Sequence, residues 1–193
     1  MAAPTLPGLT PARPVPAPAG AGARPGDPAI TITVHGAPAP QGSKRHVGGG
    51  VMIESSKKVK PWRQDVKAAA REAIEARADW QPLDGPLAVS MVFTVRHRPA
   101  GKPTWWPSGI RWSKTLMWRP ASTPDLSKLL RATEDALTDA GLWKDDARVV
   151  EYRRLAKYYA DDTTGGLDVL GVPGCVIHVW QLGEQWPDLG AVR

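Results

Sequence analysis

A repeat of apolar residues between positions 124 and 141 constrains the fold of this chain more than any other feature. Apolar side chains recur there every three or four residues, as is typical of a helix with one buried face. The residues on that face are Leu126, Leu129, Leu130, Thr133, Ala136, Leu137 and Ala140. Thr123–Pro124 opens the segment, and Gly141 is placed to end it, because glycine readily adopts the left-handed conformation after a helix. The pattern therefore predicts a helix that packs one face against a core.

Residues 30–36 and 86–97 alternate in the manner of half-buried β-strands. Further strands are expected at 149–159 and 175–182, with a short apolar piece at 51–53 as another candidate. A second helix is expected from a cap at Ser55 or Ser56, through Pro61 in its first turn, to about Ala78. Strands and helices interleave irregularly, so we expect the α+β class: a single small domain with a mixed β-sheet packed by two main helices.

The composition changes along the chain and divides it into three parts. Residues 1–28 hold eight prolines, seven alanines and four glycines, and such a segment cannot bury enough apolar surface to offset the entropy cost of ordering. We therefore expect a disordered tail over residues 1–28, one domain over 29–185 and a loose C-terminal end over 186–193. A spacer, a Pro-rich peptide for a partner and a late translation start remain open as explanations of the tail.

The chain of 193 residues is basic, which favours an anionic partner. Lysine and arginine total 25 against 19 acids, for a net charge of +6, and this balance points to nucleic acid without saying anything of the fold. The single cysteine, Cys175, excludes an internal disulfide framework and a cysteine-based zinc cluster. No apolar run reaches the roughly 20 residues of a membrane helix, and the N-terminus lacks the pattern of a signal peptide. We therefore expect a cytoplasmic protein without a membrane partner.

Three aspartates flank the helix predicted between positions 124 and 141 and are the first candidates for chemistry. Asp125 is expected in its first turn, and Asp145 and Asp146 follow its end, just before the strand of residues 149–159. If the chain returns the pair to Asp125, the carboxylates supply the oxygen ligands that Mg²⁺ requires. Each also has a purely structural explanation, as a favourable acid at a helix start or as a turn residue. Spacing alone leaves both interpretations open.

Cationic and aromatic side chains are the candidates for contact with nucleic acid. Arg131 would clamp a phosphate beside a metal site, and the alternative is a solvated arginine or a partner of Asp135. The basic candidates for binding DNA are Lys44, Arg45, Lys60, Arg63, Lys67 and Lys128, for which a solvated face is the alternative. Trp105 and Trp106 belong to a tryptophan-rich connection over residues 99–119, where exposed indoles would stack on bases or wedge strands apart.

The segment Ser122–Lys157, STPDLSKLLRATEDALTDAGLWKDDARVVEYRRLAK, resembles the RusA family of Holliday junction resolvases, which phages and prophages often carry. The diagnostic segment of that family has an Asp-x-Asp-Asn start to a helix, a lysine on the helix, an Asp-Ala-Leu ending and an Asp-Asp turn into a strand. The order of these features, and the spacing from the first aspartate to the Asp-Asp turn, fit here without gaps. More loosely, the resemblance covers residues 30–183.

This resemblance implies a site built on four residues. The family's catalytic aspartates fall on Asp125 and Asp146, with Asp145 beside the second, and its functional lysine falls on Arg131. The aspartates would hold Mg²⁺, with Mn²⁺ as a substitute, so that water attacks the phosphodiester. The resemblance further implies a homodimer whose two sites nick opposed strands of four-way junction DNA symmetrically, in DNA recombination and repair.

One position departs from the family pattern. The second aspartate of the pair is replaced by Ser127, a weak neutral ligand, so either fewer carboxylates hold the metal or another acid, such as Asp135, compensates. Lys128 stands at the following asparagine position, where its charge would partly replace attraction that the site has lost. Two alternatives stay open: a non-catalytic protein that binds junctions or single strands on the same scaffold, and a single-strand-binding protein that uses tryptophan platforms.

Overall fold

The computed structural model describes residues 26–42, 44–46, 52–54, 58–113, 116 and 118–182, and for 44–46 and 52–54 it describes the backbone alone. All but residues 26–28 of the expected tail therefore lie outside the described residues, as does the expected loose end at 186–193. Within the described ranges, no helix combines the length and the hydrophobicity that a membrane crossing requires.

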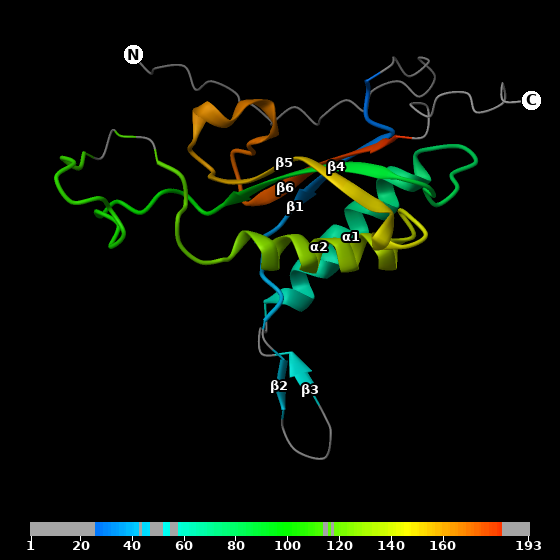
Figure 1. Ribbon diagram of the computed structural model, residues 1–193, viewed down its shortest axis with the longest axis horizontal. Helices are drawn as coiled ribbons and strands as arrows, with labels where there is room; N and C mark the ends of the chain where they lie inside the picture. The colour runs from blue at the N-terminus through cyan, green and yellow to red at the C-terminus, as the bar shows by residue number, and fades with distance from the viewer. Residues whose placement is uncertain are drawn as a thin grey trace, which may run out of the picture.

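A four-stranded mixed sheet forms the centre of the domain (Figure 1). Its strands are β1 (Ile30–His35), β4 (Leu87–Val95), β5 (Val149–Tyr159) and β6 (Gly174–Gln181), in the spatial order β1-β6-β4-β5. Antiparallel pairing joins β6 to both β1 and β4, whereas β5 runs parallel to β4. The predicted α+β class with a mixed sheet is thereby confirmed, and β5 lies at an edge of the sheet.

Helices α1 (Val59–Glu75) and α2 (Leu126–Ala140) cover one face of this sheet (Figure 1). The crossover between the parallel strands β4 and β5 contains α2, because parallel neighbours cannot be joined by a tight turn. Trp62 of α1 is fully buried against α2, and its indole N–H donates to the Thr133 hydroxyl at 3.1 Å. Gly141 follows α2 with a φ of 78°, which confirms the predicted end of this helix.

Helix α1 ends earlier than the periodicity predicts. Its last residue is Glu75 rather than one near Ala78, because the chain leaves the helical conformation before Asp79, whose φ is 58°. A positive φ is uncommon outside glycine, and aspartate is among the residues that adopt it most readily. The residue before α1 is Lys58, whose side chain forms no capping hydrogen bond.

The predicted caps Ser55 and Ser56 lie outside the described residues. The sequence also predicts a loop around Lys44 and Arg45, and this is wrong, because both residues lie in β2 (Lys44–His46). Strand β2 pairs antiparallel with β3 (Met52–Glu54), which overlaps the short apolar piece predicted as a strand. A strand needs a partner for its backbone hydrogen bonds, and β2 supplies that partner.

The sequence favours a place in the core for Trp62, Trp143 and Trp180, which lie outside the tryptophan-rich connection, but these residues divide between the two faces of the sheet. Trp62 and Trp143 are buried in the main core beneath the helices, as predicted. Trp180 is only half-buried, so its assignment to the core is wrong. Its indole N–H donates to the carbonyl of Gly26 at 3.0 Å, and the Arg153 guanidinium lies 4.5 Å from its ring centre. The reason is that Trp180 lies on the face of the sheet opposite the helices.

Candidate functional site

Asp125 marks the N-terminal end of α2 and presents its carboxylate to solvent. It is the residue immediately before the helix, one position earlier than the sequence predicts, and its side chain caps no backbone N–H. The carboxylate is half exposed, and its Oδ2 lies 3.0 Å from Nζ of Lys128, one helical turn further on. An exposed pair of this kind contributes little to stability. The carboxylate oxygens are therefore open to a ligand approaching from solvent.

A half-buried lysine lies behind Asp125. Nζ of Lys157, on β5, donates hydrogen bonds to the carbonyl oxygens of Ser122 and Pro124, the second at 2.7 Å. Partial burial lowers the pKa of Lys157, and the negative charge of Asp125 opposes this shift. Lys157 thus holds the backbone just before Asp125 and places a second cation near its carboxylate. No motif in the sequence singles out Lys157, although its position two residues after Leu155, which packs against the main core, places it on the same face of β5.

The two aspartates that follow α2, Asp145 and Asp146, have different surroundings. The Asp145 carboxylate accepts a hydrogen bond from the backbone N–H of Ala147 at 2.8 Å and so caps the short 3₁₀ helix η1 (Asp146–Arg148). Asp146 is the first residue of η1 and is exposed. No hydrogen bond or ion pair joins its side chain to another residue in the described part of the chain. Of the pair, Asp146 is the more available to a ligand.

A half-buried glutamate on α2 lies near Asp146. Glu134 accepts a hydrogen bond from the Tyr152 hydroxyl on β5. Burial raises the pKa of Glu134, the bond from Tyr152 opposes this, and the negative charges of Asp146 and Asp135 add to the rise. Burial and the bond to Glu134 also raise the pKa of Tyr152. Glu134 lies off the apolar face of α2, which predicts a solvated side chain, whereas the structure leaves it only partly exposed because Tyr152 of β5 lies over it.

The structure does not gather the three predicted aspartates into one cluster of ligands. Glu134, the neighbour of Asp146, lies nine residues after Asp125, which is about 14 Å along a helix axis. Within the described residues, no group of three or more acidic, histidine or cysteine side chains is arranged to hold a metal ion. The donor chemistry nevertheless suits Mg²⁺, which often takes one or two carboxylates and completes its shell with water and phosphate oxygens.

Ser127 and Arg131 lie on the exposed side of α2. Arg131 has no hydrogen bond or ion pair with any other described residue. Asp135 pairs instead with Arg63 of α1, at 3.4 Å, so the predicted alternative in which Arg131 partners Asp135 is wrong. The Arg131 guanidinium is consequently available to a phosphate, while Asp135 serves the contact between the two helices.

The predicted DNA-binding cations on α1 differ in whether they already form ion pairs with α2. Arg63 and Lys67 both form ion pairs with Asp139 of α2, at 3.3 and 4.0 Å. Lys60 is exposed, and its side chain forms no hydrogen bond or ion pair with any other residue in the described ranges. Contact between DNA and the first two side chains would compete with the bonds that join α1 to α2, whereas Lys60 is free of that competition.

The segment just before Lys44 and Arg45 contacts α2 through Gln41. The backbone N–H of Gln41 donates to the carbonyl of Lys128 at 3.1 Å, and the Gln41 side-chain amide lies 3.4 Å from a carboxylate oxygen of Asp135. Lys44 and Arg45 follow within a few residues, in β2. Strand β2, which carries Lys44 and Arg45, therefore begins a few residues after a segment that contacts α2.

Trp105 and Trp106 pack against a small second core formed by Val95, Trp118 and Tyr159. The ring centres of Trp105 and Trp106 lie 6.0 Å apart, and Trp106 meets Trp118 edge-on at 5.5 Å. Both residues remain partly exposed. Their indoles are thus held in an aromatic cluster beside the sheet, with an accessible part left for a stacking partner.

Comparison with known proteins agrees with the resemblance seen in the sequence. A family model described as Endodeoxyribonuclease RusA matches residues 35–169, which is more than half of the chain. The matched span contains Asp125, Arg131 and the pair Asp145–Asp146. No curated protein matches the chain significantly.

Proposed function

The chain belongs to the RusA endodeoxyribonuclease family, and we propose that it resolves Holliday junctions by symmetrical paired nicks. Membership supports a hydrolase that cleaves phosphodiester bonds within DNA. The choice of four-way junctions as substrate, the metal and the roles of single residues belong to the proposal. One observation carries it: the exposed carboxylate of Asp125 stands beside two lysines, inside the span that the family model matches.

The cations around Asp125 suit a phosphate. Lys128 pairs with the Asp125 carboxylate, and Lys157 lies on the strand behind it. A carboxylate alone repels a phosphodiester, whereas neighbouring cations reverse the sign of the local field. Arg131 is exposed on the same helix and can donate two parallel hydrogen bonds to phosphate oxygens. These side chains would orient the scissile phosphate and stabilise the charge that develops on its oxygens.

Asp125 and Asp146 would each contribute one carboxylate to Mg²⁺, or to Mn²⁺ in its place, and because the structure does not bring the two together, each carboxylate would serve an ion of its own whose shell water and phosphate oxygens complete. Such an ion, when bound, polarises the phosphodiester and makes a coordinated water more acidic. Asp145 could join as a ligand only with its second oxygen or after giving up its bond to the backbone N–H of Ala147. Ser127 offers a neutral hydroxyl where the family pattern has a carboxylate. The donor set of this chain is therefore poorer in charge than the family pattern.

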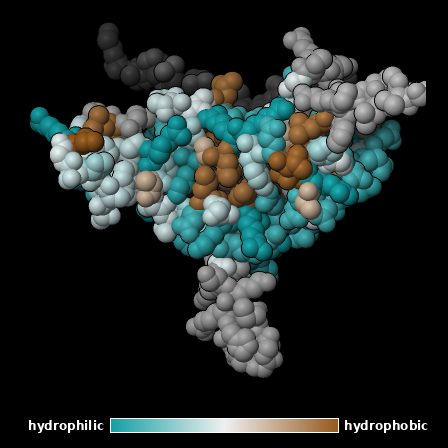
Figure 2. All heavy atoms as spheres, viewed as in Figure 1, coloured by the Kyte–Doolittle hydropathy of each residue, from teal (hydrophilic) through white to brown (hydrophobic). Residues whose placement is uncertain are grey.

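We include a homodimer in the proposal, since a junction presents two equivalent strands to a two-fold pair. Edge strand β5 is a candidate interface, because Val150 is 64% exposed and Tyr152 is 42% exposed. Figure 2 shows hydrophobic patches within the hydrophilic surface on the side where α2 and β5 lie in Figure 1. A cytoplasmic location also belongs to the proposal, in keeping with the free, buried thiol of Cys175.

The test is cleavage of a synthetic mobile four-way junction, with Mg²⁺ and with chelator, beside linear duplex and single strand. Wild-type protein should produce paired symmetrical nicks that vanish with chelator. Asp125→Asn and Asp146→Asn should each abolish cleavage and leave junction binding intact or tighter, because a lost carboxylate repels phosphate less. Asp79→Asn is the matched control, since Asp79 is exposed after α1 and its φ of 58° suits asparagine.

Each other outcome changes the assignment. Normal cleavage by Asp146→Asn would remove Asp146 from the site. Tight junction binding without cleavage in Mg²⁺ or Mn²⁺ would refute the nuclease and favour the non-catalytic alternative, with Ser127 as the reason. Preference for single strands over junctions would favour the tryptophan platforms. Light scattering should report twice the mass of the chain, and a monomer at the assay concentration would refute the dimer.

A further inference from the structure

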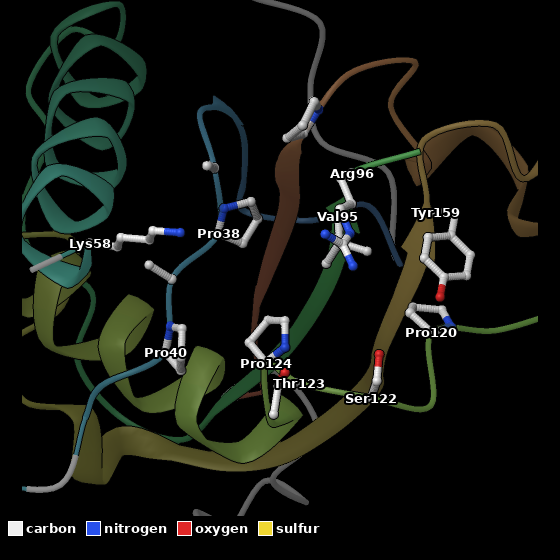
Figure 3. Close-up of a pocket in the computed structure, with 13 residues that line it drawn as sticks. Pro38, Pro40, Lys58, Val95, Arg96, Pro120, Ser122, Thr123, Pro124 and Tyr159 are labelled. Carbon is white, nitrogen blue, oxygen red and sulfur yellow. The ribbon is translucent and has the colours of Figure 1, made fainter. Parts of the chain in front are cut away.

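A pocket of about 450 Å³ opens at the end of the sheet, beside the start of α2 (Figure 3). Segments far apart in the sequence form it. They are residues 37–40 after β1, Lys58 before α1, Val95 and Arg96 at the end of β4, Pro120 and residues 122–124 before α2, Tyr159 at the end of β5, and Pro173 before β6. A volume of this size lies within the range of small-molecule sites in proteins.

The walls of the pocket are largely apolar and rigid. The rings of Pro38, Pro40, Pro120 and Pro124 surround it in Figure 3, and Val95 and the alanines of the segment 37–40 also line it. Proline has a compact ring and little side-chain freedom to lose when a ligand binds. The walls are therefore preformed for a flat apolar group.

The polar groups of the pocket are cationic or neutral, and none is acidic. They are the ammonium of Lys58, the guanidinium of Arg96 and the hydroxyls of Ser122, Thr123 and Tyr159. No hydrogen bond or ion pair joins these side chains to one another or to other residues in the part of the chain that the structure describes. All five groups are thus open to an external partner, and their charge selects an anion.

The pocket adjoins the carboxylate that the proposed function uses. Pro124 lines the pocket, and Asp125 is the next residue, one Cα spacing of about 3.8 Å away. Lys157 holds the backbone between the pocket and Asp125 in place, because its ammonium donates hydrogen bonds to the carbonyls of Ser122 and Pro124. A ligand that occupies the pocket is therefore held in a fixed position relative to Asp125.

We propose that the pocket receives one nucleotide of a DNA strand, adjacent to the phosphate at Asp125 and turned out of the base stack. This inference rests on the proposed function. The base lies against the prolines and Val95, the hydroxyls of Ser122 and Tyr159 meet its edge, and Arg96 and Lys58 bind the phosphate beyond it. Turning a base out costs least where pairing and stacking are already interrupted. The pocket thereby favours a branch point over linear duplex.

The experiment places 2-aminopurine, a base that brightens when it leaves the stack, in turn at each position around the crossover of a four-way junction. The full-length protein is added in chelator, so that the measurement does not depend on cleavage. Ser122→Phe fills the pocket, and it spares the bond to Lys157, which uses the backbone carbonyl. Ala121→Phe is its control, because Ala121 is exposed and lines no part of the pocket.

A second pair of variants tests the charge. Arg96→Gln removes the pocket guanidinium at an exposed position, and Arg71→Gln removes an exposed guanidinium from α1. We expect wild type and both controls to brighten the probe several-fold at one position. Ser122→Phe should abolish the signal and Arg96→Gln should reduce it. In Mg²⁺, Ser122→Phe should slow cleavage by about 10²-fold, as expected when a reacting group is misplaced.

The experiment distinguishes failure of the nucleotide pocket from failure of the proposed nuclease function. A probe that brightens equally with Ser122→Phe and with wild type, or that never brightens with wild type, would overturn the pocket while normal cleavage upheld the nuclease. Position-specific brightening lost only in Ser122→Phe and Arg96→Gln, without any cleavage in Mg²⁺, would uphold the pocket and refute the nuclease. Free deoxynucleotides that bind while the junction probe stays dark would also overturn the proposal.

Discussion

Replacing Lys157 with methionine removes the cation that holds the chain just before Asp125. Its ammonium donates to the carbonyls of Ser122 and Pro124. A hydrogen bond from a charged donor contributes roughly 1.5–3 kcal/mol. The two bonds together fall well short of twice that amount, because Ser122 is exposed to water and because methionine regains the burial that the ammonium resists. We expect the free energy of unfolding to fall by about 2 kcal/mol.

Thermal unfolding measures this loss. For a domain of this size a loss of about 2 kcal/mol lowers the midpoint by about 4–8 °C. Lys144→Met is the matched control, because Lys144 donates to an exposed Asp84 at 2.6 Å and an exposed pair of this kind contributes little. Lys157→Arg should recover part of the loss, since a guanidinium can donate to both carbonyls.

The same variant separates positioning from folding. At a temperature where Lys157→Met is fully folded, junction cleavage should still fall well below wild type, because the backbone before Asp125 has lost its anchor. Junction binding should fall less than cleavage does, since Lys128 and Arg131 still offer cations to the phosphate. A midpoint equal to that of Lys144→Met, or wild-type cleavage, would refute the reasoning.

Two further predictions concern stability. Thr133→Val removes a hydroxyl that accepts from the Trp62 indole at 3.1 Å and donates to the Leu129 carbonyl at 2.9 Å, so denaturant unfolding should show a loss of about 1–3 kcal/mol. The loss should be smaller when Trp62 is already phenylalanine, and strict additivity would contradict the pairing. Partial burial alone would raise the pKa of Asp161, but hydrogen bonds from the backbone and guanidinium of Arg98 hold it below 3.8. A lowered carboxylate pKa stabilises the fold above that value and ceases to do so as the pH falls through the native pKa. Asp161→Asn should therefore lower the free energy of unfolding by about 1 kcal/mol near neutral pH. In acid unfolding, the difference in stability between the variant and wild type should disappear below pH 3.8. A difference that persists in acid would contradict the pairing of Asp161 with Arg98.

The strongest local patterns of the sequence were sufficient to predict the principal elements. The apolar spacing from Leu126 onward and the glycine at 141 give α2 and its end, because both act within one or two turns of the chain. Alternation predicts β1 and β4 for the same reason. The order of Asp125 and the Asp145–Asp146 pair along the chain also suffices to indicate the family, which the family match confirms.

Only the tertiary structure decided which side chains meet. Lys157 reaches the carbonyl of Pro124 from β5, and Glu134 accepts a hydrogen bond from the Tyr152 hydroxyl. These contacts depend on the parallel register of β4 and β5 and on the way α2 lies over them, which no local periodicity encodes.

The pocket beside α2 shows the same limit most clearly. Its lining comes from the ends of three strands, the start of one helix and the approach to another. Periodicity reports which face of an element is buried, whereas it carries no information on which elements become neighbours. The sequence therefore determined the elements and the acids that mark the site. Packing alone decided which cations, hydroxyls and prolines surround them, because those contacts join residues that are distant along the chain.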